Sequence, residues 1–558
     1  MDRRRLTAFT KKRLAAALAG TAVVALALSG CSGAGNGGAQ SADGRIPVLN
    51  FGGFGGGSNP KPNYNPYLAT SLSVTNYLYE PLMMLNQYSC DYEPWLATKM
   101  TWKDPSTLVY TLRDGVKFSD GTPFTADDVV FTYDMIKAHP ALDTRGAWSS
   151  LKSVSKTGSN EVTMTFNGAG ASDLPAVNSV LIVPQHIWSK VKDPTTFADT
   201  KPVGTGSMTV ESMNPTQLVL KRNPDYWQAD KIHVDKLQFN NSDQGQVDQL
   251  KLARGDYDMN AMYIPDIEKS YVSKDPKHNK YWFPAGSPIS LYMNLEKSPF
   301  GDEKFRSAIA QAMDKKSIVD DAEQGYVTAA SQTSLVLPAA KDWLPSSIPD
   351  EGVITYDVSA AKSALDQAGY KLDGSGKRLG KDGKPLSFSI QIPGGWNDWI
   401  QAGKVIQKDF QALGISVDMQ NPTPDVQGQN RLTGQYDLTF GVRGGTCDMY
   451  TNFLEPLASS ETAPTGQPAK TNEVRWRDAK TDELIAQLGQ ESDPAKQKAT
   501  VGELATIMYE QKPYIPLWYG ASWFEYSTKR AVGWPSASDP YAKPGDMPII
   551  LTHLRPAK

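Results

Sequence analysis

Apolar residues recur at helical spacing in several stretches of this 558-residue chain. Phe305, Ile309 and Met313 stand four residues apart behind Asp302, so their side chains share one face of a helix. Helices are predicted on this basis over 302–313, 398–413 and 494–512. Short apolar runs of strand length lie at 46–51, 162–166, 386–391 and 436–442. Helices and strands interspersed in this way predict an α/β fold.

The most apolar run lies at the N-terminus. Residues 14–28 are uncharged and follow six basic residues, which predicts a secretory signal peptide over 1–30. The run is shorter than the roughly 20 residues that a membrane-spanning helix needs. It ends at Leu28-Ser29-Gly30-Cys31, which resembles the lipobox of bacterial lipoproteins. That resemblance implies a lipid on Cys31 and a place on the cell membrane outside the cytoplasm. The composition of 31–44, rich in Gly, Ser and Ala without periodicity, predicts a flexible tether. An ordinary signal peptide or a short membrane anchor is the alternative, and either the general secretory or the twin-arginine export route fits.

The composition is that of an ordinary globular protein, with 40% hydrophobic and 21% charged residues. A formal charge of −3 and the lack of a basic block argue against nucleic acid as a partner. The five histidines and three cysteines show no metal-ligand spacing, so neither a metal nor another cofactor is expected. With Cys31 lipidated, Cys90 and Cys447 remain, either as a disulfide or as two buried thiols.

Ordered sequence blocks carry a family resemblance. The most specific block runs from 110 to 130 and includes a Thr125…Asp128 capping box at the start of a helix. It resembles the signature of the family 5 solute-binding proteins of bacterial ABC importers. Met208, directly after a further block at 204–207, stands where that family usually has an aromatic residue. Further blocks match in the same order at 204–207, 220–227, 294–314, 356–370 and 514–517.

The resemblance implies a two-lobed periplasmic-binding-protein clamp (type II-like, cluster C) with an extra inserted domain. Two strands near Tyr292 and Pro516 would form the hinge. Ligand would drive closure by binding the closed state more tightly than the open one. The implied division is 45–80, 204–290 and 516–558 for the discontinuous lobe I, 81–203 for the inserted domain, and 291–515 for lobe II.

The first candidate ligand-binding residues lie in the loop 443–450, after the strand 436–442. In peptide-binding members of the family, an acidic residue of the matching loop pairs with the peptide amino terminus, and Asp448 falls there. Arg443 stands in the place of a basic residue that can meet a ligand carboxylate. Thr446 and Cys447 lie between them. The alternative for Asp448 is a capping residue in a surface turn.

The remaining candidates are aromatic or lie at strand ends. Trp396 and Asn397 follow the strand 386–391, where ligands commonly bind in α/β lobes. Trp523 belongs to an aromatic tail that offers flat stacking surfaces, although such clusters also form cores. Phe51 and Phe54 lie at the glycine-rich end of the first strand, whose backbone could pair with a peptide.

The function predicted first is capture of an oligopeptide in the interlobe cleft and delivery to ABC permease subunits, by a monomer without enzymatic activity. The alternative is the same role for a β-linked, cello-oligosaccharide-like ligand. An extracytoplasmic hydrolase is a remote third possibility, because no GxSxG or HExxH motif is present.

Overall fold

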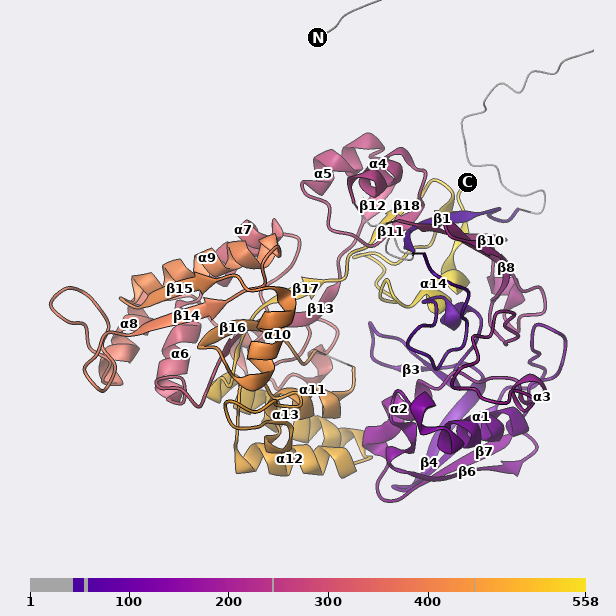
Figure 1. The fold of residues 1–558 in the computed structure, drawn as a ribbon, viewed down its shortest axis with the longest axis horizontal. Helices are drawn as coiled ribbons and strands as arrows, with labels where there is room; N and C mark the ends of the chain where they lie inside the picture. The colour runs from indigo at the N-terminus through magenta and orange to yellow at the C-terminus, as the bar shows by residue number, and fades with distance from the viewer. Residues whose placement is uncertain (1–43, 55–58, 243–244, 446) are drawn as a thin grey trace, which may run out of the picture. The chain divides into compact units, whose positions relative to one another are not determined.

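A computed structural model describes residues 44–54, 59–242, 245–445 and 447–558. Three sheets of four or more strands organise this part of the chain (Figure 1). The signal peptide, Cys31 and Thr446 lie outside the described residues. Among the described residues, no helix is both long and apolar enough to cross a membrane.

A seven-stranded sheet collects strands from distant parts of the chain. Its middle strand β1 pairs in parallel with β10 on one side and with β11 on the other. Leu49, Phe51 and Phe54 of β1 are buried. The spatial order is β12 (Asn279–Tyr281), β18 (Glu525–Ser527), β11 (Met259–Asn260), β1 (Leu49–Phe54), β10 (Lys236–Asn241), β9 (Gln217–Arg222) and β8 (Met208–Asn214).

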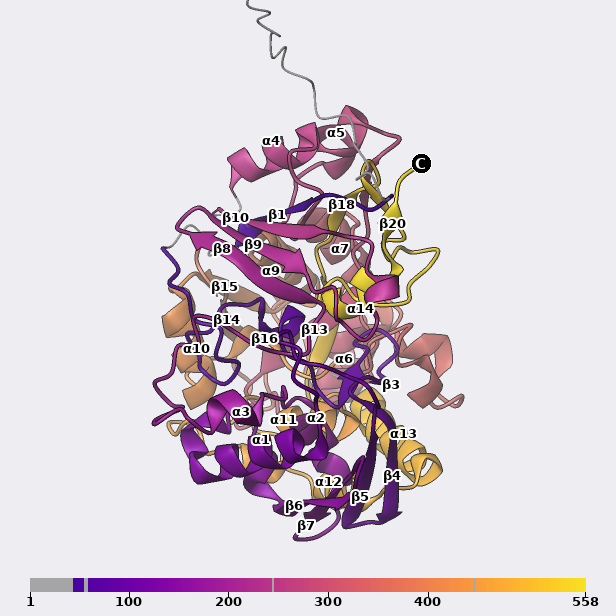
Figure 2. The ribbon, with the colours of Figure 1, turned by 90° about the vertical axis from the view of Figure 1, so that its right-hand side faces the viewer.

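A four-stranded antiparallel sheet comes from the sequence between β1 and β8 (Figure 2). It is ordered β4 (Ala97–Asp104), β5 (Thr107–Leu112), β7 (Glu161–Phe166) and β6 (Leu151–Gly158). Helix α1 (Ala126–Ala138) packs on it and starts with the predicted capping box of Thr125 and Asp128. A short hairpin of β2 (Met83–Leu85) and β3 (Tyr92–Pro94) precedes it. One continuous core underlies both this sheet and the seven-stranded sheet, and we call the two sheets together the first lobe.

A five-stranded sheet with its own helices forms what we call the second lobe. Its order is β15 (Ser416–Gln420), β14 (Ser387–Gln391), β16 (Leu438–Val442), β13 (Ala285–Met293) and β17 (Ile515–Ala521). Leu291 and Met293 of β13 belong to one core, whereas Tyr292 between them belongs to another, so both faces of the sheet are covered. One face carries α6 (Glu303–Ala312), α7 (Lys315–Glu323), α8 (Val358–Gln367) and α9 (Asn397–Ala412). The other carries α11 (Met449–Leu457), α12 (Ala479–Gln490) and α13 (Pro494–Gln511).

The predicted helices are confirmed within a few residues. Helix α6 begins after its N-cap Asp302, and α13 begins after Asp493 with Pro494 in its first turn. Helix α9 ends before Gly414, which adopts the left-handed conformation with φ of 81°. These helices were predictable because their caps and apolar spacing are local features.

The described chain crosses between the two lobes twice, at 282–284 and at 522–524. The crossings run side by side: the Trp282 N–H donates to the Phe524 carbonyl at 2.9 Å and the Ser522 N–H to the Pro284 carbonyl at 3.1 Å. Tyr292 and Pro516, where the hinge was expected, lie a few residues inside the second lobe on β13 and β17. The domain boundaries stay predictions, and β17 pairs within the five-stranded sheet before the chain returns to β18.

Candidate ligand-binding site

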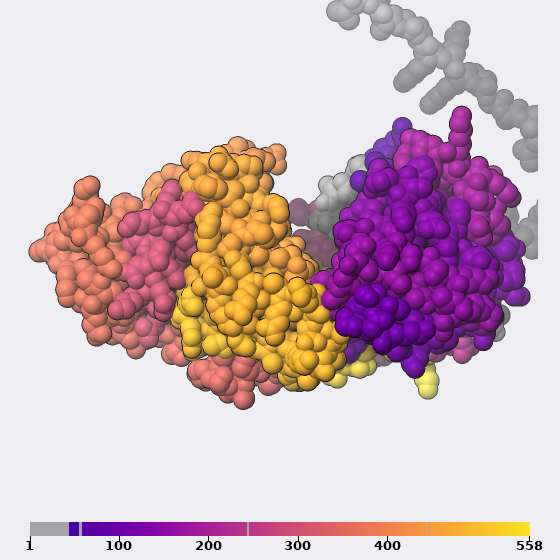
Figure 3. Space-filling view, turned by 90° about the horizontal axis from the view of Figure 1, so that it is seen from below, coloured from indigo at the N-terminus to yellow at the C-terminus, as the bar shows by residue number. Residues whose placement is uncertain are grey.

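A cavity of about 610 Å³ lies between the two lobes. The first lobe contributes the β2–β3 hairpin, the segment 171–175 and Lys543 of the C-terminal tail. The second lobe contributes the start of β13, the loop 445–450, Trp343 and Gln497. Next to it, η5 (Ala171–Asp173) meets α12, seen in Figure 3 where the purple and gold surfaces touch. A second groove, of about 630 Å³ on α12 and α13, draws its walls from the second lobe alone.

The loop between β16 and α11 brings the predicted acidic residue to this cavity. Gly444 and Gly445 both have φ of 74°, which favours glycine. A Cβ on Gly445 would lie 2.8 Å from side-chain atoms of Pro288 and Val336. This close approach holds the loop against β13, so that Asp448 follows at the cavity wall.

Asp448 is the N-cap of α11 as well as a wall residue. Its carboxylate accepts the backbone N–H groups of Tyr450 at 3.1 Å and Thr451 at 3.2 Å, and also the Thr451 hydroxyl. Burial raises the pKa of Asp448, and these hydrogen bonds oppose the rise. Asp448 therefore caps α11 and lines the cavity at the same time. Its contact with a ligand stays a prediction.

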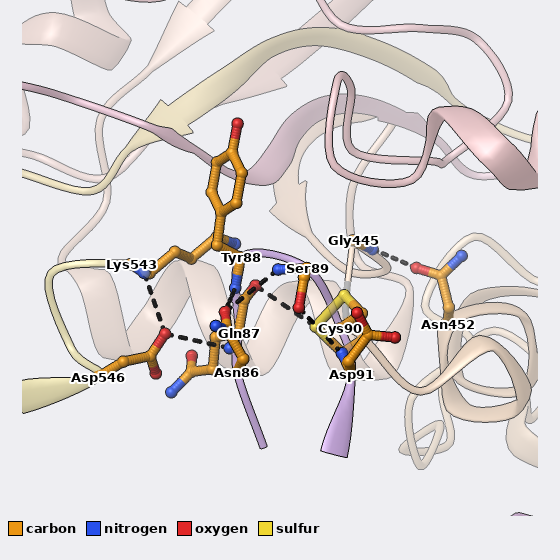
Figure 4. The surroundings of a disulfide bond; sticks show 11 residues. Asn86, Gln87, Tyr88, Ser89, Cys90, Asp91, Gly445, Asn452, Lys543 and Asp546 are labelled. Carbon is orange, nitrogen blue, oxygen red and sulfur yellow. Dashed lines mark hydrogen bonds between the residues drawn. A yellow bond between two sulfur atoms is a disulfide. The ribbon is translucent and has the colours of Figure 1, made fainter. Parts of the chain in front are cut away.

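Cys447 forms a disulfide with Cys90 of the β2–β3 hairpin, with the two Cα atoms 5.0 Å apart. Of the two alternatives left open by the sequence, the structure therefore has the disulfide (Figure 4). Both cysteines line the cavity. They join parts of the chain 357 residues apart.

Sequence reasoning missed the cation of the cavity, Lys543. The Asp546 carboxylate holds its segment by accepting the backbone N–H groups of Lys543 at 3.0 Å and Gln87 at 3.1 Å. The Lys543 side chain lines the cavity, forms no ion pair with the described residues, and burial lowers its pKa. No sequence motif in the tail indicates that Lys543 lines a cavity, because the hairpin next to it lies far away in the sequence.

Aromatic rings on both walls were also missed. Tyr92 comes from the hairpin, and Trp343 and Tyr450 come from the second lobe. Burial and the charge of Asp448 raise the pKa of Tyr92, and both side chains line the cavity. Tyr92 could have been suspected from its place at the start of the family match, which begins at residue 91.

Arg443 lies in an ionic cluster of the second lobe and is not a wall residue of this cavity. Its guanidinium lies 3.5 Å from carboxylate oxygens of both Glu455 and Glu473. Glu473 is buried and also pairs with Arg431 at 2.7 Å. Buried carboxylates need such partners, so the cluster accounts for Arg443 without a ligand.

The other predicted aromatic residues lie outside this cavity. Trp396 is 43% exposed at the start of α9, with its ring 4.6 Å from that of Trp399, and Asn397 is the first residue of that helix. The ring of Trp523 lies on a lobe crossing, 4.7 Å from that of Phe283 and 5.3 Å from that of Tyr263. Trp396, Asn397 and Trp523 therefore stay predictions for a more extended ligand.

Phe51 and Phe54 belong to the core of the first lobe. Their rings lie 5.1 and 6.3 Å from the ring of Phe239 on β10. Phe51 pairs with Phe239 on one side and with Met259 on the other, so β1 offers a peptide no free edge there. The ligand contacts proposed below do not include them.

Comparison with known proteins identifies the family. Residues 91–464 match the family described as bacterial extracellular solute-binding proteins, family 5. The chain belongs to this family. Its predicted two-lobed fold is thereby confirmed. Among the described residues of this family 5 protein, no group of three or more His, Cys, Asp or Glu side chains could hold a metal ion.

Several relatives of this family 5 protein are named for their ligands. The oligopeptide-binding protein AppA of Bacillus subtilis is 25% identical over 415 residues, 73% of this chain and 74% of that protein. A periplasmic oligopeptide-binding protein of Thermotoga maritima, 26% identical, superposes with a TM-score of 0.80 over 91% of this chain and 99% of its own. A structure of the same Thermotoga protein with bound mannohexaose gives a TM-score of 0.70, over 91% of this chain and 98% of its own.

Proposed function

We propose that this family 5 protein captures an oligopeptide in the interlobe cavity and delivers it to the permease of an ABC importer. The observation that carries the proposal is the pair of opposite charges in the cavity wall, Asp448 and Lys543. A peptide has an ammonium at one end and a carboxylate at the other. A buried charge needs a partner of opposite sign, and the carboxylate of a zwitterionic peptide supplies one for Lys543. Its ammonium complements the negative charge of Asp448.

Lys543 is the more specific of the two proposed ligand contacts. Its ammonium forms no ion pair with the described residues, whereas the carboxylate of Asp448 already serves as a helix cap. A ligand carboxylate that reaches Lys543 gains a charge-assisted hydrogen bond at little cost to existing contacts. We therefore expect the carboxyl end of the ligand to determine affinity more than the amino end.

A thermal-shift screen of residues 44–558 with di- to hexapeptides and oligosaccharides tests the proposal. Ligand at 100 times its dissociation constant adds about 2.7 kcal/mol to the free energy of unfolding. For the best peptide, amidation of its carboxyl end should weaken binding to the wild type by about 10–100-fold. Lys543→Met should weaken binding of the unmodified peptide by the same factor. It should not weaken binding of the amidated peptide any further.

Lys384→Met is the matched control, because Lys384 lies on a turn of the second lobe with 81% of its side chain exposed. It should bind the free acid like the wild type. If neither amidation of the peptide nor Lys543→Met changes the affinity, the proposed contact between Lys543 and the ligand carboxylate is wrong. If no peptide stabilises the protein, the peptide proposal itself is wrong.

An oligosaccharide is the second candidate. Tyr92, Trp343 and Tyr450 offer aromatic faces in the cavity, and sugars stack on such faces. The Thermotoga protein that resembles this chain has been seen with mannohexaose. Stabilisation by mannohexaose or cello-oligosaccharides, but by no peptide, would favour this candidate. Lys543→Met would then leave affinity unchanged, since a neutral sugar presents no carboxylate.

We further propose that Cys31 carries the lipid that holds the protein on the outer side of the cell membrane. The support is the Leu28-Ser29-Gly30-Cys31 match behind an apolar run of signal-peptide length. Phase separation in detergent tests it: the wild type should partition into the detergent phase, and Cys31→Ala should remain in the aqueous phase. Equal partitioning of both proteins would contradict lipid attachment.

A further inference from the structure

We propose that the Cys90–Cys447 disulfide is a third covalent connection between the two lobes and restricts how far they move apart. The disulfide would thereby regulate the proposed ligand-binding cavity, and only this biological meaning rests on the proposed function. The restraint on lobe movement itself does not require a ligand.

The Cys90 end of the disulfide is fixed to the first lobe. Within the hairpin loop, the Cys90 N–H donates to the Asn86 carbonyl at 2.8 Å. Asn86 in turn donates its side-chain amide to the Tyr541 carbonyl at 2.8 Å, and the Gln87 N–H donates to Asp546 at 3.1 Å. The loop is therefore held by the C-terminal tail of the same lobe, and Cys90 moves with it (Figure 4).

The Cys447 end is fixed to the second lobe. The backbone N–H of Gly445 donates to the side chain of Asn452 on α11, and Asp448 caps the same helix. Gly445 also lies against Pro288 of β13. These contacts tie the loop to both the sheet and a helix of the second lobe, so Cys447 follows that lobe.

The two chain crossings alone form a single narrow hinge. They lie side by side and are joined by the hydrogen bonds of the Trp282 and Ser522 N–H groups. A third link outside that hydrogen-bonded pair opposes rotation about it, because opening then has to stretch or twist the linked loops. Tyr88 of the hairpin packs on Trp282, with ring centroids 5.8 Å apart, which couples the linked loop directly to a crossing.

The restraint acts at the wall of the proposed ligand-binding cavity. Cys90 and Cys447 both line the cavity. Reduction by a dithiol breaks the sulfur–sulfur bond: each cysteine sulfur gains one electron and one proton, and the dithiol leaves as its own disulfide. In the reduced protein, the hydrogen bonds between the two crossings should break more often, and ligand should exchange faster.

Hydrogen–deuterium exchange of the full chain tests the inference without any ligand. In Cys90→Ser/Cys447→Ser, and in the wild type with dithiothreitol, the Trp282 and Ser522 amides should exchange on the order of tenfold faster than in the oxidised wild type. The amides of β9 and β10 should not change. Dithiothreitol should have no effect on the double variant, and Ser89→Ala in the same loop should behave like the wild type.

Equal exchange of Trp282 and Ser522 in the oxidised and reduced wild type would overturn the inference. So would a uniform acceleration that includes β9 and β10, because it would mean that the disulfide stabilises the fold rather than restrains the lobes. The reduced wild type keeps the test valid if the double variant fails to fold. Failure of the peptide proposal would leave these outcomes unchanged.

Discussion

Asp448 combines two tasks that substitutions can separate. Its carboxylate accepts two backbone N–H groups and the Thr451 hydroxyl at the start of α11, and it lines the cavity. Asp448→Asn keeps a side-chain oxygen for the cap but removes the charge. Asp448→Ala removes both, so a comparison of the two variants distinguishes the cap from the ligand contact.

The cap sets the effect on stability. Replacement of an N-cap Asp by Ala costs about 0.5–2 kcal/mol, whereas Asn is almost as good a cap as Asp. Because Asp448 is half-buried and accepts two backbone N–H groups and a hydroxyl, we expect about 2 kcal/mol for Asp448→Ala and well under 1 kcal/mol for Asp448→Asn. Asp478 is a matched control: it caps α12 through the Thr481 N–H and hydroxyl, both at 2.7 Å. Asp478→Ala should cost about the same, roughly 1–2 kcal/mol.

The charge sets the effect on binding. If the ligand ammonium pairs with Asp448, both Asp448 variants lose a charge-assisted hydrogen bond and bind the best peptide about 3–10-fold more weakly, a smaller loss than Lys543→Met causes. Asp478→Ala should bind like the wild type. Urea denaturation and isothermal titration calorimetry measure the two effects separately. Wild-type affinity in Asp448→Asn would refute the ammonium contact, and unchanged stability in Asp448→Ala would refute the role of the cap.

Two further predictions concern the fold. Burial raises the pKa of Glu525 to about 8, and the Met262 N–H at 3.2 Å offsets little of this rise. The folded protein thus keeps a proton that the unfolded chain releases above about 4.5, so stability should fall as pH rises from about 4.5 to 8. Glu525→Gln should abolish this fall, which is on the order of 4 kcal/mol in the free energy of unfolding at pH 8. Urea denaturation at several pH values measures it, and the same pH dependence in the variant would contradict the raised pKa of Glu525. Gly204→Ala would place its Cβ 2.0 Å from the Leu78 carbonyl oxygen, so we expect a loss above about 4 kcal/mol or no soluble protein. Gly168→Ala, with no atom within 4 Å of its Cβ, should stay within about 0.5 kcal/mol of the wild type, and a similar stability for both variants would contradict the steric argument.

Much of the secondary structure could be predicted because it depends on neighbouring residues. The N-caps Asp302 and Asp493, the stop at Gly414 and the capping box of Thr125 all act within one or two helical turns. The order of the family blocks added the two-lobed fold, which the family match confirms. Asp448 was predicted from the matching loop of the family, and the structure has it in the cavity wall; its contact with a ligand stays a prediction.

The composition of the site depended on tertiary contacts. Phe51 was expected at the ligand but is enclosed by β10 and β11, which come from 185 or more residues later in the chain. Arg443 was expected to face a ligand but is paired with Glu455 and Glu473. Lys543 meets the hairpin of Cys90 only because the C-terminal tail folds back on the first lobe.

The sequence by itself determined the family and several of the helices and strands, because these follow from local spacing and ordered motifs. The tertiary structure alone decided that Cys90 bonds to Cys447 and that Lys543 and Tyr92 share a cavity with Asp448. The physical reason is that local propensity and spacing act over a few residues. Contacts between distant segments depend instead on how whole sheets and helices bury their apolar faces.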